Sequence, residues 1–135
     1  MQKTRGFEKA DWSKEAKDFK MPERASSKSA GYDIYYCGKE QIDIYPLGTS
    51  PPIPTGVKAF MKEDEFLLLS VARPLGLNRN LQLAVSTGVV DSENSEEIVV
   101  KLRNMDSKAV QSIRPGEKLA LGIFQKCLAA DEDCS

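Results

Sequence analysis

The chain has 135 residues, a mass of 15.0 kDa and a formal net charge of −1, with 19 Lys and Arg against 20 Asp and Glu. This length predicts one domain with one hydrophobic core, and the balanced charge disfavours binding to nucleic acid or to an anionic membrane. Because the sequence contains no histidine, imidazole bases and Ser-His or Cys-His nucleophile pairs are excluded, and any chemistry falls to carboxylates, lysine, tyrosine or water.

Residues 1–20 are charged throughout and lack the apolar segment of a signal peptide. Within them, Trp12, Ala16 and Phe19 recur at helical spacing behind Asp11, a residue type that caps helices well. The segment is therefore expected to form either a short helix or an extended arm containing the first strand. Since no apolar run reaches the ~20 residues that span a bilayer, a cytoplasmic location without membrane contact is expected.

Residues 21–135 are expected to form one β domain, because short segments with strand character alternate with turn residues. The lack of a long periodic helix between them favours an all-β sandwich or barrel over an α/β fold. Three prolines in "TSPPIP", Thr49–Pro54, predict a surface connection. The expected strands lie within residues 41–48, 56–61, 65–71, 81–85, 96–104, 108–113 and 117–124.

The three cysteines, Cys37, Cys127 and Cys134, are odd in number and form no Cys-x-x-Cys pair. This pattern disfavours both a disulfide framework and a zinc site. The thiols are interpreted as buried or incidental, and no metal is expected to bind directly to protein side chains.

Three short motifs carry a more specific signal: "SAGYDI" at Ser29–Ile34, "STGVVD" at Ser86–Asp91 and "IRPGEKLALGIF" at Ile113–Phe124. In the first, Gly31 lets the backbone pass close to a neighbouring segment while an aromatic ring and a carboxylate follow it. In order and spacing, the three motifs resemble those of the trimeric dUTP diphosphatase (dUTPase) family over most of the chain, from about residue 22 to residue 128.

The resemblance implies a β jelly roll, a homotrimer with active sites at subunit boundaries, and hydrolysis of dUTP to dUMP and pyrophosphate. Mg²⁺ would bind only through the phosphates of the nucleotide. By the same resemblance, Asp33 lies near the catalytic centre and Asp91 orients the attacking water as general base. The uracil would be read by the hairpin, and the nucleotide-binding positions would be Val85, Ser86, Thr87, Gly88, Val89 and, beside the sugar, Asn94.

The chemistry of a carboxylate suits the role implied for Asp91, since a base there needs only hydrogen-bond reach to a water molecule. The alternative is an ordinary hairpin aspartate whose side chain bonds its own backbone.

Other positions depart from the family pattern. Placed without gaps, the family's Arg-Ser-Gly segment falls on residues 72–74, where Pro74 cannot donate a backbone hydrogen bond to a phosphate. Asn94 stands where the family has a tyrosine, and Lys118 where it has an arginine. No counterpart of the family's Gly-rich C-terminal lid motif is seen in the sequence. Arg73 and Lys118 remain as candidate phosphate-binding residues.

These observations leave three functions open. The first is a dUTPase-fold nucleotide-binding or regulatory protein with impaired hydrolysis, whose ligand is dUTP, dUMP or another nucleotide. The second is an active, divergent dUTP diphosphatase in which Arg73 and Lys118 replace lost phosphate contacts around Asp91. The third is a phage or mobile-element protein that sequesters a signalling nucleotide or binds a host regulator. Taken singly, Arg73, Arg79, Lys101 and Arg103 are also interpreted as solvated surface charges.

Overall fold

The structure, a computed structural model, describes residues 3–16 and 19–132. Within these ranges helical structure is confined to the 3-10 helix η1 (Asp11–Glu15) and the α-helix α1 (Arg73–Asn78), and the remaining regular elements are strands. The all-β prediction is therefore confirmed. The strands are β1 (Gly6–Lys9), β2 (Tyr32–Tyr35), β3 (Ile42–Ile44), β4 (Ile53–Pro54), β5 (Val57–Phe60), β6 (Glu65–Val71), β7 (Leu81–Leu83), β8 (Gly88–Asp91), β9 (Val99–Val100), β10 (Leu102–Asn104), β11 (Gln111–Ile113) and β12 (Lys118–Lys126).

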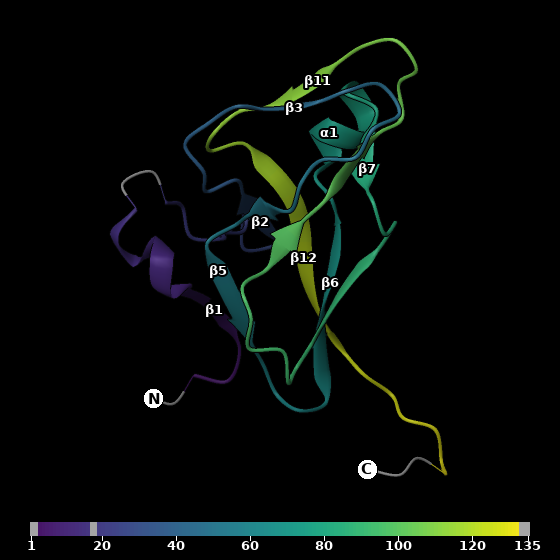
Figure 1. Ribbon diagram of the computed structural model, residues 1–135. Helices are drawn as coiled ribbons and strands as arrows, with labels where there is room; N and C mark the ends of the chain where they lie inside the picture. Colours follow the sequence, from purple (N-terminus) through teal and green to yellow (C-terminus); the bar gives the residue numbers. More distant parts are fainter. Residues whose placement is uncertain (1–2, 17–18, 133–135) are drawn as a thin grey trace.

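The central sheet has the strand order β2-β12-β6-β8, and each neighbouring pair in it is antiparallel. Four two-stranded sheets complete the fold: β1-β5, β3-β11, β4-β9 and β7-β10. Figure 1 shows the long β12 running beside β6 through the middle of the molecule, with β3, β11 and α1 together at one end. Beyond β12 the chain runs away from the body, and Leu128 in this stretch is almost fully exposed.

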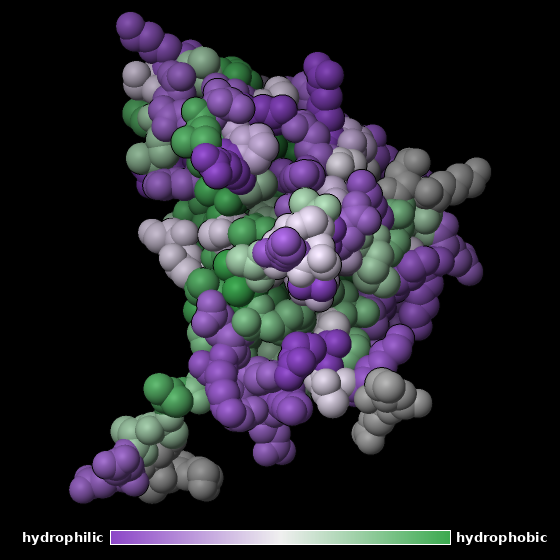
Figure 2. Space-filling model, turned by 180° about the vertical axis from the view of Figure 1, so that it is seen from behind, coloured by the Kyte–Doolittle hydropathy of each residue, from purple (hydrophilic) through white to green (hydrophobic). Residues whose placement is uncertain are grey.

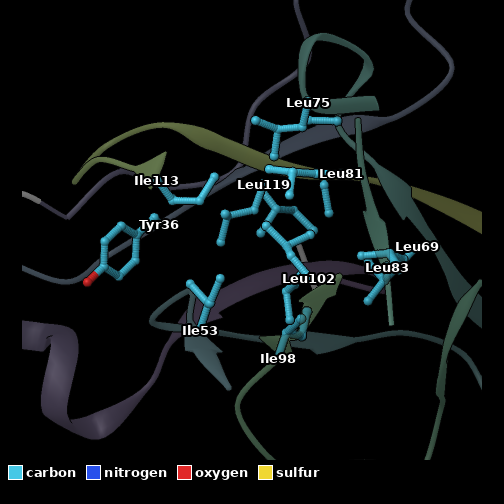
Figure 3. Close-up of a cluster of buried hydrophobic side chains, with 14 of the residues drawn as sticks. Tyr36, Ile53, Leu69, Leu75, Leu81, Leu83, Ile98, Leu102, Ile113 and Leu119 are labelled. Atoms are coloured by element: carbon cyan, nitrogen blue, oxygen red, sulfur yellow. The ribbon is translucent and has the colours of Figure 1, made fainter. Parts of the chain in front are cut away.

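The hydrophobic core fills the space between these sheets, and Figure 3 shows it as a cluster of mostly aliphatic side chains, with the ring of Tyr36 at one side. Alternation places Leu67 and Leu69 of β6 in this core, whereas their neighbours Phe66 and Leu68 are only half-buried. Asn104 is among the polar side chains buried in the described residues, and it has no exposed surface. Its amide nitrogen donates to the carbonyl oxygens of residues 44 and 109, and its oxygen accepts from the N–H of residue 106, so its burial is compensated.

Leu119→Ala is expected to lower the free energy of unfolding by about 3 kcal/mol, because it leaves a cavity at a fully buried position of β12. Leu77→Ala is the matched control, since the side chain of Leu77 is 70% exposed and its loss should change stability by less than about 0.5 kcal/mol. Urea denaturation followed by circular dichroism measures both, and equal losses in the two variants would contradict this placement of the core.

The N-terminal segment combines both alternatives expected for it. Gly6–Lys9 is the extended strand β1, paired with β5, but residues 12–16 form no α-helix. The 3-10 helix η1 ends at Glu15, the backbone of the next residue, Ala16, is extended, and Asp11 lies inside the first turn rather than at the cap. The physical reason is a tertiary anchor: the Ser13 hydroxyl, fully buried, donates to the carbonyl oxygens of Ala10 at 2.9 Å and Gly56 at 2.6 Å.

In the part of the chain that the structure describes, neither η1 nor α1 has the length and apolar character required to cross a membrane.

Candidate functional site

The predicted site residues fall into two groups at opposite edges of the central sheet. Asp33 lies on β2 and pairs with Leu121 of β12, which pairs with Ser70 of β6. Asp91 ends β8 and pairs with Phe66 of β6. Three strand spacings and four residues along β6 therefore separate the backbones of the two residues, by roughly 20 Å at ordinary sheet dimensions. Within one chain, the structure does not bring Asp33 and Asp91 together.

The first group gathers at the start of β12. The ammonium group of Lys118 lies 3.3 Å from a carboxylate oxygen of Asp33, and both side chains are partly exposed. The backbone N–H of Ala72 donates to the carbonyl of Leu119 at 2.9 Å, which places Arg73 in the next position beside this pair. The structure thus brings Asp33, Arg73 and Lys118 to one end of the sheet, and we call these three residues the phosphate end, after the phosphate-binding role predicted for Arg73 and Lys118.

The segment that contains Pro74 is the first turn of α1 rather than an open loop. Proline is tolerated there because the N–H it lacks would have no partner within the helix. The N–H groups of Leu75 and Gly76 donate to the carbonyl oxygen of Ala72 at 3.0 and 3.2 Å. The backbone of residues 74–76 therefore has no N–H left to donate to a ligand.

The second group surrounds the β8 hairpin. Gly88 packs tightly on β6, since a Cβ there would lie 3.1 Å from the Cβ of Leu69. Ser86 adopts a positive φ of 67° at the preceding turn, and the side chains of Val85 and Val89 are 72% and 57% exposed. A groove runs along this hairpin, lined by Leu69, Val85, Thr87, Gly88, Val89, Val90, Asn94, Glu96, Glu97, Ile98 and Val99. Of the predicted nucleotide-binding residues, Val85, Thr87, Gly88, Val89 and Asn94 line this groove, whereas Ser86 does not.

Strand β8 is the edge strand of the central sheet. Its outer side presents backbone N–H and C=O groups that no neighbouring strand of the sheet covers. These groups match what a uracil edge requires, namely an alternation of donors and acceptors. The groove along β8 therefore supplies both an apolar surface for a ring and backbone groups for its polar edge.

In the turn after β8, the side chain of Asn94, and not that of Asp91, makes the hydrogen bond to the backbone. The Asn94 N–H donates to the Asp91 carbonyl at 3.0 Å, and the Asn94 side-chain oxygen accepts from the Glu96 N–H at 2.8 Å. Among the described residues, none makes a hydrogen bond to the Asp91 carboxylate, which is exposed. The hairpin-aspartate alternative, in which the Asp91 side chain bonds its own backbone, is therefore wrong, and the carboxylate is accessible to water.

Comparison with known proteins identifies the family of this fold and these motifs. The family model described as dUTPase matches residues 17–134. The chain belongs to the dUTPase family. It is 34% identical to the deoxyuridine 5′-triphosphate nucleotidohydrolase of Lactococcus lactis subsp. lactis, in an alignment that covers 97% of this chain and 88% of the relative.

Solved dUTPase structures share the fold. The dUTPase of Streptococcus mutans superposes with a TM-score of 0.75 at 29% identity, over 93% of this chain and 98% of the other. A mutant dUTPase from phage phi11 of Staphylococcus aureus, described as coordinating a structural Mg(II) ion, gives a TM-score of 0.80 at 18% identity, over 98% and 97% of the two chains. The expected dUTPase jelly roll is confirmed.

dUTPases use Mg²⁺, an ion that proteins hold through side-chain oxygens or through the phosphates of a bound substrate. Residues 3–16 and 19–132 contain no set of three or more Asp, Glu or Cys side chains placed to hold a metal ion. Of the cysteines, Cys37 is buried and Cys127 is exposed, while Cys134 lies outside the described residues.

Interpreting Arg79 as a solvated charge was wrong. Its guanidinium forms a two-pronged ion pair with the Glu117 carboxylate, at 2.7 and 3.0 Å, and also donates to the Ser112 carbonyl at 2.9 Å. The sequence carries no local signal for this pair, because 38 residues separate its members. The two Arg79–Glu117 contacts are shorter than the 3.3 Å contact between Lys118 and Asp33 at the phosphate end.

The pKa of Glu117 reflects two opposing effects. Burial raises it, but hydrogen bonds from the Arg79 side chain and the Arg114 N–H, together with the two positive charges, lower it to a net value below the ordinary 4.5. A carboxylate with a depressed pKa stabilises the fold at pH values above its unfolded pKa, and that stabilisation is lost as the pH falls through the folded pKa.

Glu117→Gln is therefore expected to destabilise the protein near neutral pH and to lose this effect in acid. The difference in free energy of unfolding between wild type and variant should shrink towards zero as the pH falls below 4.5. Urea denaturation at a series of pH values measures it. A difference that grows on acidification would contradict the ion pair.

Proposed function

We propose that this dUTPase family member binds a uracil nucleotide, dUTP or dUMP, in sites formed between the copies of a homotrimer, and that it hydrolyses dUTP slowly. In each site, the β8 hairpin of one copy would hold the base, and the phosphate end of a neighbouring copy would hold the phosphates. The main observation behind this proposal is that roughly 20 Å separate Asp91 from Asp33 within one chain. One nucleotide that uses both groups must lie between two chains.

Surface chemistry supports assembly into a trimer. The side chains of Val85, Val89 and Val99 are exposed around the hairpin, and Figure 2 shows apolar surface reaching solvent between hydrophilic regions on the rear face. Exposed apolar surface of this kind is typical of interaction sites. A closed ring of three copies would place a neighbouring chain beside these valines and leave the backbone edge of β8 to the nucleotide.

In the proposed reaction, the Asp91 carboxylate takes a proton from water while the water oxygen bonds to the α-phosphorus of dUTP. The bond from that phosphorus to the oxygen bridging to the β-phosphorus breaks, and pyrophosphate leaves with the electron pair. Arg73 and Lys118 of the neighbouring copy offset the charge that develops on the leaving group. Mg²⁺ held by the phosphates would add further neutralisation when bound.

The first turn of α1 supports slow hydrolysis. Backbone donors aimed at a developing charge are worth about 2.7–4 kcal/mol each to the transition state. In this chain Pro74 has no N–H, and those of Leu75 and Gly76 are bonded to Ala72. The proposal therefore keeps binding, through side-chain charges and the β8 edge, and loses the contribution that free amides at residues 74–76 would make to catalysis.

An active diphosphatase is the second candidate, favoured by the exposed Asp91 carboxylate, which is accessible to water. One pair of measurements separates the candidates: calorimetry with a non-hydrolysable dUTP analogue and Mg²⁺, and pyrophosphate release from dUTP, with the Streptococcus mutans dUTPase as reference. We expect analogue binding together with turnover at least about 100-fold below the reference. Binding with turnover within a hundredfold would establish the active enzyme, and no binding would overturn both.

A further inference from the structure

A guanidinium–carboxylate pair ties the only α-helix of the described residues to the loop that precedes β12. The Arg79 side chain leaves the C-terminal end of α1, where its own N–H donates to the Leu75 carbonyl at 3.1 Å. Its guanidinium reaches Glu117 at 2.7 and 3.0 Å and the Ser112 carbonyl at 2.9 Å. The Arg79 and Glu117 side chains are 35% and 24% exposed, so water screens this pair less than it screens a surface pair.

Glu117 also makes hydrogen bonds that fix the loop in which it lies. Its carboxylate accepts from the Arg114 N–H at 2.8 Å, and its backbone carbonyl accepts from the Tyr36 N–H at 2.8 Å. Gly116, at a φ of 85°, donates to the Tyr36 carbonyl at 3.0 Å. These bonds hold the loop against the C-terminal end of β2, the strand that carries Asp33. Lys118 directly follows Glu117 in the sequence.

Helix α1 is therefore tied at one end to β12 and at the other end to the loop that precedes β12. At the first end, the Ala72 N–H bonds the Leu119 carbonyl, and at the second end Arg79 bonds Glu117. Arg73 directly follows Ala72 in the sequence, and Lys118 directly follows Glu117. A six-residue helix is marginal by itself, so its placement, and with it that of Arg73, depends on such ties.

We infer that Arg79 is a positioning residue that, through Glu117, sets the spacing between Arg73 and Lys118 and so tunes the site for nucleotides with a phosphate chain. The inference rests on the proposed function. The planar fork of a guanidinium fixes both distance and orientation of its carboxylate partner, which a lysine ammonium does not. A change from Arg79 to lysine keeps the charge but removes this orientation.

The test compares Kd values of wild type and Arg79→Lys for dUMP and for a non-hydrolysable dUTP analogue with Mg²⁺, by calorimetry. The analogue should bind about tenfold more weakly to Arg79→Lys, as expected for the loss of one well-oriented charged hydrogen bond, while the Kd for dUMP changes less than about twofold. Arg5→Lys is the matched control, because Arg5 forms an equivalent two-pronged pair with Glu65, at 2.6–3.2 Å, at the far end of β6. Its Kd values should match wild type.

Glu117→Gln provides a second variant with nearly the same shape, and it should show the same selective loss for the analogue. Equal weakening for both nucleotides, or no weakening for either, would overturn the positioning role and leave the proposed function standing. Wild-type protein that binds neither nucleotide would instead overturn the proposed function, and the inference with it.

Discussion

Asp91→Asn is expected to lower the turnover of dUTP by about 10³-fold, the usual loss when a general base is removed. The affinity for a non-hydrolysable analogue should change less than about threefold, since asparagine keeps the shape of the side chain and one acceptor oxygen. The reason lies in the structure of the hairpin: the Asp91 carboxylate ends the edge strand β8, is exposed, and is not consumed in closing the turn. Single-turnover experiments with labelled dUTP measure the slow residual rate.

Asp64→Asn is the control for this variant, because it removes an exposed carboxylate from the same end of the sheet, where its ion pair with Lys126 is long, at 3.6 Å. Its turnover should equal that of wild type. An Asp91→Asn protein that keeps the wild-type rate would show that another group activates the water.

Mixing two inactive variants is expected to restore activity. Asp91→Asn damages the hairpin of its own chain, and Arg73→Ala damages the phosphate end of its own chain. If each site takes its hairpin from one copy and its phosphate end from the neighbour, random trimers of the two variants contain about a quarter of intact sites. Co-expression with two different affinity tags, followed by purification on both, isolates the mixed trimers, each of which has one intact site in three, so their turnover should reach about a third of the wild-type value.

The same experiment tests the opposite arrangement. If one chain held the whole site, every copy in the mixed trimer would carry one damaged group, and its turnover would stay at the level of the separate variants. The separation of Asp33 and Asp91 across the four-stranded sheet makes that outcome incompatible with the proposed function.

Much of the fold could be predicted from local chemistry. Gly31 in "SAGYDI" was expected to allow a close approach of the backbone, and a Cβ at this position would lie 2.6 Å from the Gly122 carbonyl oxygen of β12. Other local signals misled because pairing partners are distant in sequence. Residues 96–104 were expected to form one strand but contain β9 and β10, which pair with the different strands β4 and β7.

The proline-rich stretch shows how burial can override composition. Thr49–Pro54 was expected to be a surface connection, yet Ile53 is fully buried and pairs with Val100. The strand pairing survives because it is only two residues long and lies in a two-stranded sheet, where a proline at one position costs little. Alternation of apolar residues alone does not reveal such a short buried contact.

For the candidate site, sequence motifs indicated the groups but not their arrangement. Asp33 and Lys118 are far apart in the chain, and only the β2-β12 pairing places them 3.3 Å from each other. The Arg79–Glu117 pair was missed for the same reason. The helical turn at Pro74 was also not foreseen, because a proline there is compatible with a loop and with the start of a helix.

A crystal structure of the protein with a non-hydrolysable dUTP analogue and Mg²⁺ tests most directly whether the site is formed between copies. We expect the uracil on the backbone edge of β8 of one copy, and the phosphates beside Arg73 and Lys118 of its neighbour. An analogue whose base and phosphates contact the same copy, or whose base lies away from β8, would contradict the proposed site.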